Sequence, residues 1–282
     1  MKNLAKKCFF ILILFVFFPI LAFAHQPRIV ESRSTIVLSP EISKAYYSEL
    51  IGVPDIYIIN STTSFNLYVN ILVPDIEGQK KDISAVIFKD GIEFAKLDGV
   101  NFEWKKFYEP FGADTYLMGP EYRAQAESGS YEIRVTSPRN DSKYSLAIGE
   151  IEAFNMKEGI NALTVIPEIK KNFFNESPIS FILSSFGWGL IIVLYIFSFI
   201  VGIVYRFILK RMAKGTVRGV SKNISKNDRL LRFVIGIVLL LWAVTTTWSP
   251  VLIFFSGFCF FEAIFSWCGF YAALGKNTCP IE

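Results

Sequence analysis

Histidine and cysteine are scarce in this 282-residue chain, and their positions exclude several kinds of chemistry. His25 is the single histidine, and the four cysteines are Cys8, Cys259, Cys268 and Cys279. The long region between Cys8 and Cys259 can hold no internal disulfide, so its stability must come from its own hydrophobic core. Histidine-based triads and cysteine-based catalysis are excluded there as well. A mechanism that uses only Asp and Glu stays open, since carboxylates are plentiful.

Charge is absent from residue 179 to residue 205, and this apolar stretch is long enough to span a bilayer. The formal net charge of +4 averages two unequal regions. Residues 25–177 contain 16 Lys and Arg against 22 Asp and Glu, whereas residues 206–232 contain nine Lys and Arg against Asp228 alone. An acidic region beside a short basic stretch indicates membrane topology and gives no argument for a nucleic-acid partner.

Residues 1–24 have the pattern of a secretory signal peptide. Three lysines precede the apolar run Phe9–Phe18, and Ala22-Phe23-Ala24 is a small-x-small cleavage site. Cleavage after Ala24 would make His25 the first residue of the mature chain. A retained first membrane helix is the alternative.

Residues 25–177 are predicted to form an extracytoplasmic β-sandwich. Apolar and polar residues alternate from Phe65 to Val73, which is the period of a half-buried strand. Residues 86–88 and 92–94 flank Lys89-Asp90-Gly91, and Asp-Gly tolerates the positive φ angles of a tight hairpin turn. Short strands with turn signals between them, and no long amphipathic helix, indicate a sandwich.

A second hairpin and a long loop are also predicted within this domain. Residues 131–135 and 144–148 each alternate, and the turn residues Pro138–Asp141 between them predict a second hairpin. Residues 107–122 are aromatic and interrupted by Gly and Pro, which predicts a long loop.

About three transmembrane helices are predicted at the C-terminus. The first lies within residues 178–209, a basic cytoplasmic loop follows at 210–229, and residues 230–282 form a two-helix hairpin. Its helices, Leu230–Trp248 and Pro250–Leu274, are joined so closely that they must be antiparallel. Ser225 and Asp228 resemble a capping box, which would start the second helix near Lys226.

Two independent observations predict the orientation in the membrane. The signal peptide places the N-terminal domain outside the cytoplasm, and the positive-inside rule places residues 206–232 within it. We therefore expect a protein of the plasma (inner) membrane whose C-terminus lies in the cytoplasm and whose first partner is the lipid bilayer.

The last sixty or so residues resemble the YgaP-like inner-membrane domain family, a two-helix transmembrane module. The matching segments are 223–232 and 261–279, and the second of them ends in Leu-Gly followed by Asn-Thr-Cys. Where the family has a Cys-Pro-Leu-Tyr-like element, this chain has Cys268-Gly269-Phe270-Tyr271, without the usual proline. Some members are fused to rhodanese domains that handle sulfur, and no rhodanese is visible here.

The exported domain is similar to bacterial pre-peptidase C-terminal β-sandwich modules. The similarity lies in residues 129–135, Gly-Ser-Tyr-Glu-Ile-Arg-Val, and residues 143–149, Lys-Tyr-Ser-Leu-Ala-Ile-Gly. Such modules are accessory and binding domains, so the resemblance implies binding without catalysis.

Four residues are candidates for a functional site. Cys268 and Cys279 are thiol candidates for redox sensing, persulfide handling or metal binding, or they are small packing residues. Glu262 is an intramembrane acid, either part of a transport or relay pathway or a protonated group bonded to a neighbouring helix through Thr245 or Thr246. His25 is a candidate metal ligand at the mature N-terminus, or simply a polar residue after the cleavage site.

These observations lead to a non-enzymatic envelope protein that is anchored in the membrane and needs no cofactor. Its β domain would bind an extracytoplasmic protein or a small-molecule ligand. The alternative is a sulfur- or redox-related membrane protein that uses Cys268 and Cys279, and a copper-binding domain that uses His25 is a third hypothesis.

Overall fold

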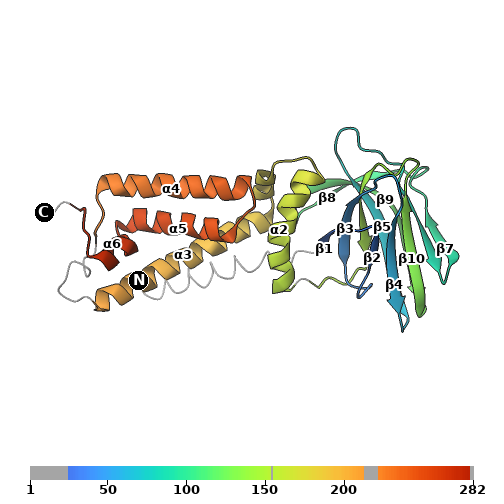
Figure 1. Ribbon diagram of the computed structural model, residues 1–282, viewed down its shortest axis with the longest axis horizontal. Coiled ribbons are helices and arrows are strands. Elements are labelled where there is room, and N and C mark those ends of the chain that lie inside the picture. Colours follow the sequence, from blue (N-terminus) through green and yellow to red (C-terminus); the bar gives the residue numbers. More distant parts are fainter. Residues whose placement is uncertain (1–24, 154, 213–221, 280–282) are drawn as a thin grey trace. The chain divides into compact units, whose positions relative to one another are not determined.

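The computed structural model describes residues 25–153, 155–212 and 222–279, so the predicted signal peptide and part of the basic loop lie outside the described residues (Figure 1). The chain divides after Ser184 into a β-rich unit and a helical unit. This agrees with the predicted fold class at the level of a mainly β domain followed by C-terminal helices.

The β-rich unit contains two sheets. One sheet has six strands in the order β1-β3-β11-β5-β9-β8. Its strands are β1 Gln26–Ile29, β3 Lys44–Glu49, β5 Phe65–Pro74, β8 Lys105–Glu109, β9 Asp114–Ala126 and β11 Lys143–Ile148. The second sheet has five strands in the order β2-β4-β10-β6-β7. Its strands are β2 Ser34–Ile36, β4 Asp55–Ser61, β6 Ser84–Lys89, β7 Ile92–Leu97 and β10 Gly129–Thr136.

The core of this unit lies between the two sheets. Ile59 and Ile133 from the five-stranded sheet and Val69 and Leu146 from the six-stranded sheet belong to one buried cluster, and none of these side chains is exposed to solvent. Without a disulfide, this shared apolar core is the main source of stability, because burial of each such side chain contributes about 1.5–3 kcal/mol.

The strand at Phe65 and the Asp-Gly hairpin are confirmed. Residues 65–74 form β5, and the predicted turn joins β6 to β7 with φ angles of 49° at Asp90 and 83° at Gly91. Both central residues of the turn therefore occupy the left-handed region, as a two-residue hairpin loop matched to strand twist requires.

The predicted loop over residues 107–122 is wrong, because most of it lies in strands β8 and β9, which pair with each other. Pro120 sits inside β9 where the register with β5 shifts between Asn70 and Leu72. The amide of Asn70 donates to the carbonyls of Gly119 at 3.1 Å and Pro120 at 3.2 Å. A β-bulge thus accommodates a residue that cannot donate to the ladder.

The second predicted hairpin is also wrong, although its two strands exist. β10 pairs with β4 and β6, whereas β11 pairs with β3 and β5, so the turn at residues 137–142 crosses from one sheet to the other. Alternation shows that each segment is half-buried, but it carries no information about which strand lies beside it.

A helix that the sequence interpretation missed covers the outer face of the six-stranded sheet. α2 spans Met156–Asn172, begins with Asn155 as its N-cap and continues through Pro167. Ile169, Phe173 and Phe174 at its C-terminal end pack with Tyr68, Leu72 and Tyr116 of the sheet. Strand β5 is therefore buried on both faces, and a short 3-10 helix, η2 Pro178–Leu183, follows.

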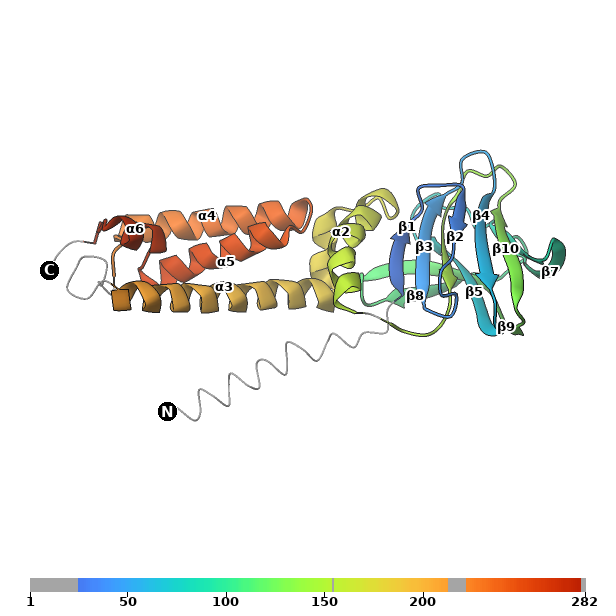
Figure 2. The ribbon, with the colours of Figure 1, turned by 60° about the horizontal axis from the view of Figure 1, so that its bottom comes forward.

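The helical unit contains α3 Ser185–Met212, α4 Lys226–Thr245, α5 Pro250–Phe265 and α6 Gly269–Leu274. Figures 1 and 2 show α3, α4 and α5 side by side. Within the described residues, α3 alone is both long and apolar enough to cross a bilayer, with a mean hydropathy of 2.5. α5 is apolar but only 16 residues long, so the predicted count of three spanning helices is not established.

The boundaries of the hairpin helices are partly as predicted. Ser225 caps α4, and its side-chain oxygen accepts a hydrogen bond from the backbone N–H of Asp228 at 3.3 Å. The single helix expected from Pro250 to Leu274 is wrong, because Ser266 takes a left-handed conformation and ends α5. A short connection then leads into α6.

Candidate functional site

A buried polar cluster closes the end of the α4–α5 hairpin that is remote from its tight joint. Asn223, which precedes α4, is 2% exposed and holds the backbone of Cys268 on both sides. Its amide nitrogen donates to the Cys268 carbonyl at 2.9 Å, and its amide oxygen accepts from the Cys268 N–H at 2.7 Å. The backbone N–H of Asn223 donates to the carbonyl of Ser266, so the start of α4 is fixed to the end of α5.

Glu262 lies in the last turn of α5 within this cluster, and it is paired. One carboxylate oxygen lies 3.3 Å from Nε of Arg232 on α4, and the other accepts a hydrogen bond from the Gly269 N–H at 3.1 Å. The carboxylate also contacts the Cys268 thiol. Breaking such a buried pair by removing one partner costs about 3–5 kcal/mol.

The expected partners of Glu262, Thr245 and Thr246, are wrong. Their hydroxyls donate to the carbonyls of Leu241 and Trp242 in their own helix, both at 2.7 Å. The geometry of the hairpin explains this result. In an antiparallel hairpin, two residues at equal distances from the joint lie side by side. Glu262 therefore lies beside the residue that precedes the joint near Trp248 by a similar number of positions. Arg232 occupies that region of α4, so the short joint was a signal that could have identified it.

The two thiol candidates have different surroundings. Cys268 is 1% exposed and caps α6, and its sulfur accepts a hydrogen bond from the Tyr271 N–H at 3.4 Å. Cys279 is half-buried, and both are free thiols. The left-handed cap expected at Gly275 is present, with φ of 69°. The chain then returns towards Asn223, since the Thr278 N–H donates to the Asn223 carbonyl at 3.1 Å.

Thr278, the middle residue of the Asn-Thr-Cys segment near the C-terminus, completes the cluster. Its hydroxyl contacts the Asp228 carboxylate and accepts from the backbone N–H of Ser225 at 3.2 Å. The C-terminal segment is thereby attached to the first turn of α4. The arrangement supplies hydrogen bonds and one ion pair, which hold helix ends together, and it presents a thiol beside a carboxylate.

His25, the candidate metal ligand, lies at the start of the β-rich unit. Its Nδ1 is hydrogen-bonded to the Ser43 hydroxyl, which in turn lies 3.4 Å from a carboxylate oxygen of Glu152. Burial lowers the pKa of His25. Among the described residues, no group of three or more His, Cys, Asp or Glu side chains gathers in a way that could hold a metal ion.

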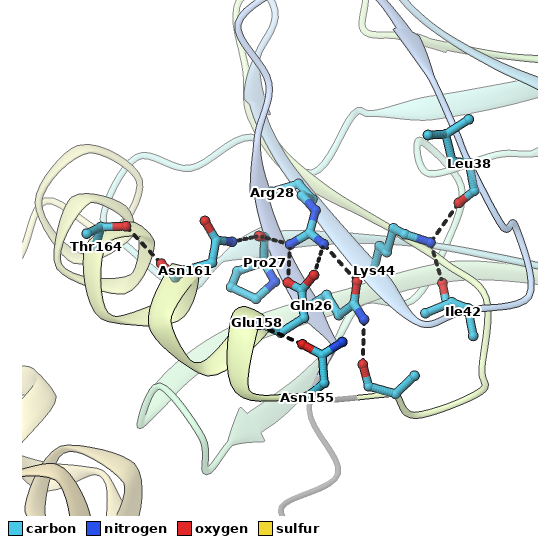
Figure 3. A network of polar contacts seen from close by, with 11 residues as sticks. Gln26, Pro27, Arg28, Leu38, Ile42, Lys44, Asn155, Glu158, Asn161 and Thr164 are labelled. Carbon is cyan, nitrogen blue, oxygen red and sulfur yellow. Dashed lines mark hydrogen bonds and ion pairs between the residues drawn. The ribbon is translucent and has the colours of Figure 1, made fainter.

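A polar network joins β1 to the N-terminal half of α2, and Figure 3 shows its side chains converging from the two elements. Arg28 on β1 donates to both carboxylate oxygens of Glu158, each at 2.8 Å, and to the side-chain oxygen of Gln26 at 2.8 Å. Asn161 donates to the Pro27 carbonyl at 3.4 Å. A two-point contact between a guanidinium and a carboxylate fixes orientation as well as distance, so α2 is oriented against the sheet.

The C-terminal half of α2 is fixed by a buried ion pair that sequence reasoning missed. Nζ of Lys170 lies 2.5 Å from a carboxylate oxygen of Asp114 on β9, and the two side chains are 0% and 3% exposed. Burial raises the pKa of Asp114 to about 7, although Lys170 pulls it downward. Beside it, the Tyr47 and Tyr116 hydroxyls share a hydrogen bond of 2.7 Å. A lysine in the last turn of a helix gave no signal that it was buried.

Two cavities of the β-rich unit differ in what they could hold. The one lined by His25, Glu109 and Asp114 has a volume of about 40 Å³, which is space for a water molecule or two. The second is an open groove of about 450 Å³ between the edge strands β1 and β2, with Arg28, Lys44 and Tyr46 along it. Lys44 Nζ donates to the carbonyls of Leu38 and Ser39 at 2.8 and 2.9 Å.

The C-terminal helices and their polar cluster define a small membrane module. Residues 220–282 match the model of the family described as inner membrane protein YgaP-like, transmembrane domain. The resemblance predicted from the sequence is thus confirmed for this region. A comparison with curated proteins finds no match.

Solved structures similar to the chain include three proteins of different kinds. The pre-peptidase C-terminal domain of collagenase from Bacillus anthracis is 12% identical over 45% of this chain and 95% of that domain, with a TM-score of 0.25. The copper-binding protein CorA of Methylomicrobium album BG8 is 8% identical over 44% of this chain and 98% of that protein, with a TM-score of 0.22. A β-glucosidase from Paenibacillus barengoltzii is 9% identical over 44% of this chain and 13% of that enzyme, with a TM-score of 0.22. At these scores none of the three supports an inference about function.

Proposed function

We propose that the protein is a membrane-anchored, non-enzymatic envelope protein whose β-sandwich lies outside the cytoplasm and binds a protein or small-molecule partner. The proposal rests on the order of three parts along the chain. A β domain with its own core comes first, a 28-residue apolar helix follows, and a region that matches an inner-membrane domain family comes last. The basic stretch after α3 supports a cytoplasmic C-terminus through the positive-inside rule.

Close packing within the helical unit supports α4 and α5 as membrane segments beside α3. A Cβ on Gly202 of α3 would lie 2.5 Å from the ring of Phe261, and one on Gly257 of α5 would lie 2.3 Å from the Ser198 hydroxyl. The Ser256 hydroxyl donates to the Gly236 carbonyl of α4 at 2.7 Å. Small residues that bring backbones together, and hydroxyls that bond across helices, are typical of packing in lipid.

The groove between β1 and β2 supports binding at the outer domain. Its volume of about 450 Å³ lies in the range of about 300–1,000 Å³ found for ligand sites. Both flanking strands are sheet edges, but the Pro27 carbonyl and the N–H and carbonyl of Ser34 are already bonded to side chains. Arg28 and Lys44 are bonded within the chain as well, which favours an occupant recognised mainly by shape.

The anchoring proposal is tested by fractionation and protease protection. We expect the protein to stay in the membrane pellet after alkaline extraction, with His25 as its first residue by mass spectrometry. Protease added to spheroplasts should digest residues 25–184 and leave a fragment beginning near residue 185. A soluble protein, or a β domain that is protected in intact spheroplasts, would contradict the proposal.

The binding proposal is tested by site-specific photo-crosslinking in living cells. A crosslinking residue at Ser34, which lines the groove, should give a discrete adduct. The same residue at Glu93, on the exposed edge strand β7 of the same sheet, is the matched control and should give none. Equal adducts at both positions, or none at either, would refute binding in this groove.

The second candidate function, sulfur or redox chemistry, has one observation in its favour. The Cys268 thiol contacts the Glu262 carboxylate, and Arg232, a cation of the kind that favours a thiolate, lies within the same cluster. Deleting residues 222–282 or residues 25–184 separately distinguishes the two functions. A phenotype that depends only on the C-terminal module and on Cys268 would favour the thiol function.

A further inference from the structure

The helical unit has a groove between the start of α4 and the end of α5, lined by both charged and apolar side chains. It has a volume of about 310 Å³ and is lined by Lys226, Arg229, Leu230, Phe233, Ala263 and Ile264. The two cations lie in the first turn of α4 or just after it, where the helix begins at the polar end of the hairpin. Leu230 and the last-turn residues Ala263 and Ile264 of α5 lie level with Arg229, and Phe233 lies about one turn farther along α4.

The two cations of the groove have no acidic partner within the described residues. The two nearby acids of the described residues are both engaged elsewhere: Glu262 is paired with Arg232, and Asp228 is bonded to Ser225 and Thr278. No ion pair forms at Lys226 or Arg229 in the part of the chain that the structure describes. Both side chains are exposed.

One of these cations is held in place by the groove itself. Nε of Arg229 donates to the carbonyl of Ala263 on α5 at 2.9 Å. This bond ties the guanidinium to the wall of the groove. Moreover, positive side chains in the first turns of a helix are electrostatically unfavourable, and a bound anion would relieve that repulsion.

The apolar wall is exposed in a way that a lipid tail would cover. Leu230 is 64% exposed, Phe233 47% and Ile264 59%. A free phosphate would leave these side chains uncovered, whereas a phospholipid supplies an anionic headgroup for the cations and an acyl chain for the apolar side chains beside them. Basic pockets between transmembrane helices are known to take anionic lipid headgroups.

We propose that the groove lined by Lys226, Arg229, Leu230, Phe233, Ala263 and Ile264 is a binding site for one anionic phospholipid. The headgroup phosphate is bound by Lys226 and Arg229, and one acyl chain lies against Leu230, Phe233 and Ile264. This inference rests on the proposed membrane placement of α4 and α5 and adds a selective lipid contact to it.

The test is a lipid titration of the full-length protein in neutral detergent, read by native mass spectrometry. The probes are dioleoyl phosphatidylglycerol and dioleoyl phosphatidylcholine, which share acyl chains and differ in net charge. The wild type should retain phosphatidylglycerol preferentially. Lys226→Gln/Arg229→Gln should weaken its retention by about 30-fold, because each cation near a membrane surface contributes about a factor of five.

The matched control removes two other charges from the same basic stretch. Lys210→Gln/Arg211→Gln, at the end of α3, should change retention by less than about threefold. The charge-conserving variant Lys226→Arg/Arg229→Lys should retain the lipid as the wild type does. Circular dichroism of each variant checks that helix content is unchanged, and the conservative variant keeps the test valid if the neutral one unfolds.

Three results would overturn the inference. The first is an equal loss of lipid retention in the groove variant and in the control, and the second is equal retention of the two lipids by the wild type. The third is displacement of phosphatidylglycerol by millimolar glycerol phosphate, which would make a free phosphate the occupant. Alkaline extraction of cell membranes is done in parallel. A protein that leaves the membrane refutes the proposed function, whereas a membrane-bound protein without headgroup preference refutes the lipid site alone.

Discussion

Replacing Lys170 by methionine would leave the carboxyl group of Asp114 buried without its partner. The two side chains are 0% and 3% exposed and lie 2.5 Å apart, and the Glu176 carboxylate lies 4.0 Å from Nζ. Removing one member of a buried pair costs about 3–5 kcal/mol. A domain of this size is stable by about 5–15 kcal/mol in total, so the variant should lose a large share of its stability.

Urea unfolding of a fragment spanning residues 25–184 measures this loss through the fluorescence of Trp104, the single tryptophan in that range. With a urea dependence of about 1–3 kcal/mol per molar, the midpoint should fall by about 2 M. The control Lys171→Met makes the same change at the exposed neighbour and should cost less than about 0.5 kcal/mol. Asp114→Leu/Lys170→Met, which removes both charges, should lie within about 1 kcal/mol of the wild type.

The loss should also depend on pH, with a defined sign. Burial raises the pKa of Asp114 to about 7 from an ordinary value of 3.8, and Glu109 and Glu176 contribute in the same direction. Between these pH values the folded state binds a proton that the unfolded state releases, so stability falls as the pH rises. Without Lys170, which lowers this pKa, the decline in the variant should be steeper and extend to higher pH. Equal effects of Lys170→Met and Lys171→Met, or a loss that shrinks from pH 5 to pH 8, would refute this reasoning.

Three further predictions follow from the contacts of Cys268, Asn223 and α2. In variants that keep one cysteine, maleimide should label native protein at Cys279 and leave Cys268 unreacted until unfolding, and labelling of native Cys268 would contradict its burial. Asn223→Ala should destabilise the protein by about 2–4 kcal/mol in thermal unfolding because it orphans two buried backbone groups, whereas Asn227→Ala at the exposed face should cost far less. A fragment of residues 25–155, which lacks α2, should bind a hydrophobic dye and melt without cooperativity, whereas residues 25–184 should melt cooperatively, and equal behaviour would show that α2 is dispensable.

Local patterns in the sequence identified the elements whose signal is contained in a few neighbouring residues. The alternation from Phe65 to Val73 predicted β5, Asp90-Gly91 predicted the turn between β6 and β7, and Ser225 predicted the start of α4. The uncharged run from residue 179 to residue 205 predicted α3. In each case the backbone conformation follows from side-chain period, positive φ or capping, which neighbours within the chain decide.

The sequence was less informative where a strong local signal was overridden. Pro167 is a residue that ordinarily breaks a helix, yet α2 continues through it, and Glu158 and Lys170 attach the two halves of the helix to the sheet. Gly119 and Pro120 predicted a loop, yet a bulge held by the Asn70 amide keeps them in β9. Tertiary contacts outweighed the local signal in both places.

The sequence by itself therefore determined which segments are half-buried strands, where α3 lies, and which family the C-terminal region resembles. The tertiary structure alone decided that β10 and β11 belong to different sheets, that Glu262 pairs with Arg232, and that Asp114 pairs with Lys170. The physical reason is that periodicity and turn chemistry act between near neighbours, whereas each of these pairings depends on which two distant surfaces exclude water together.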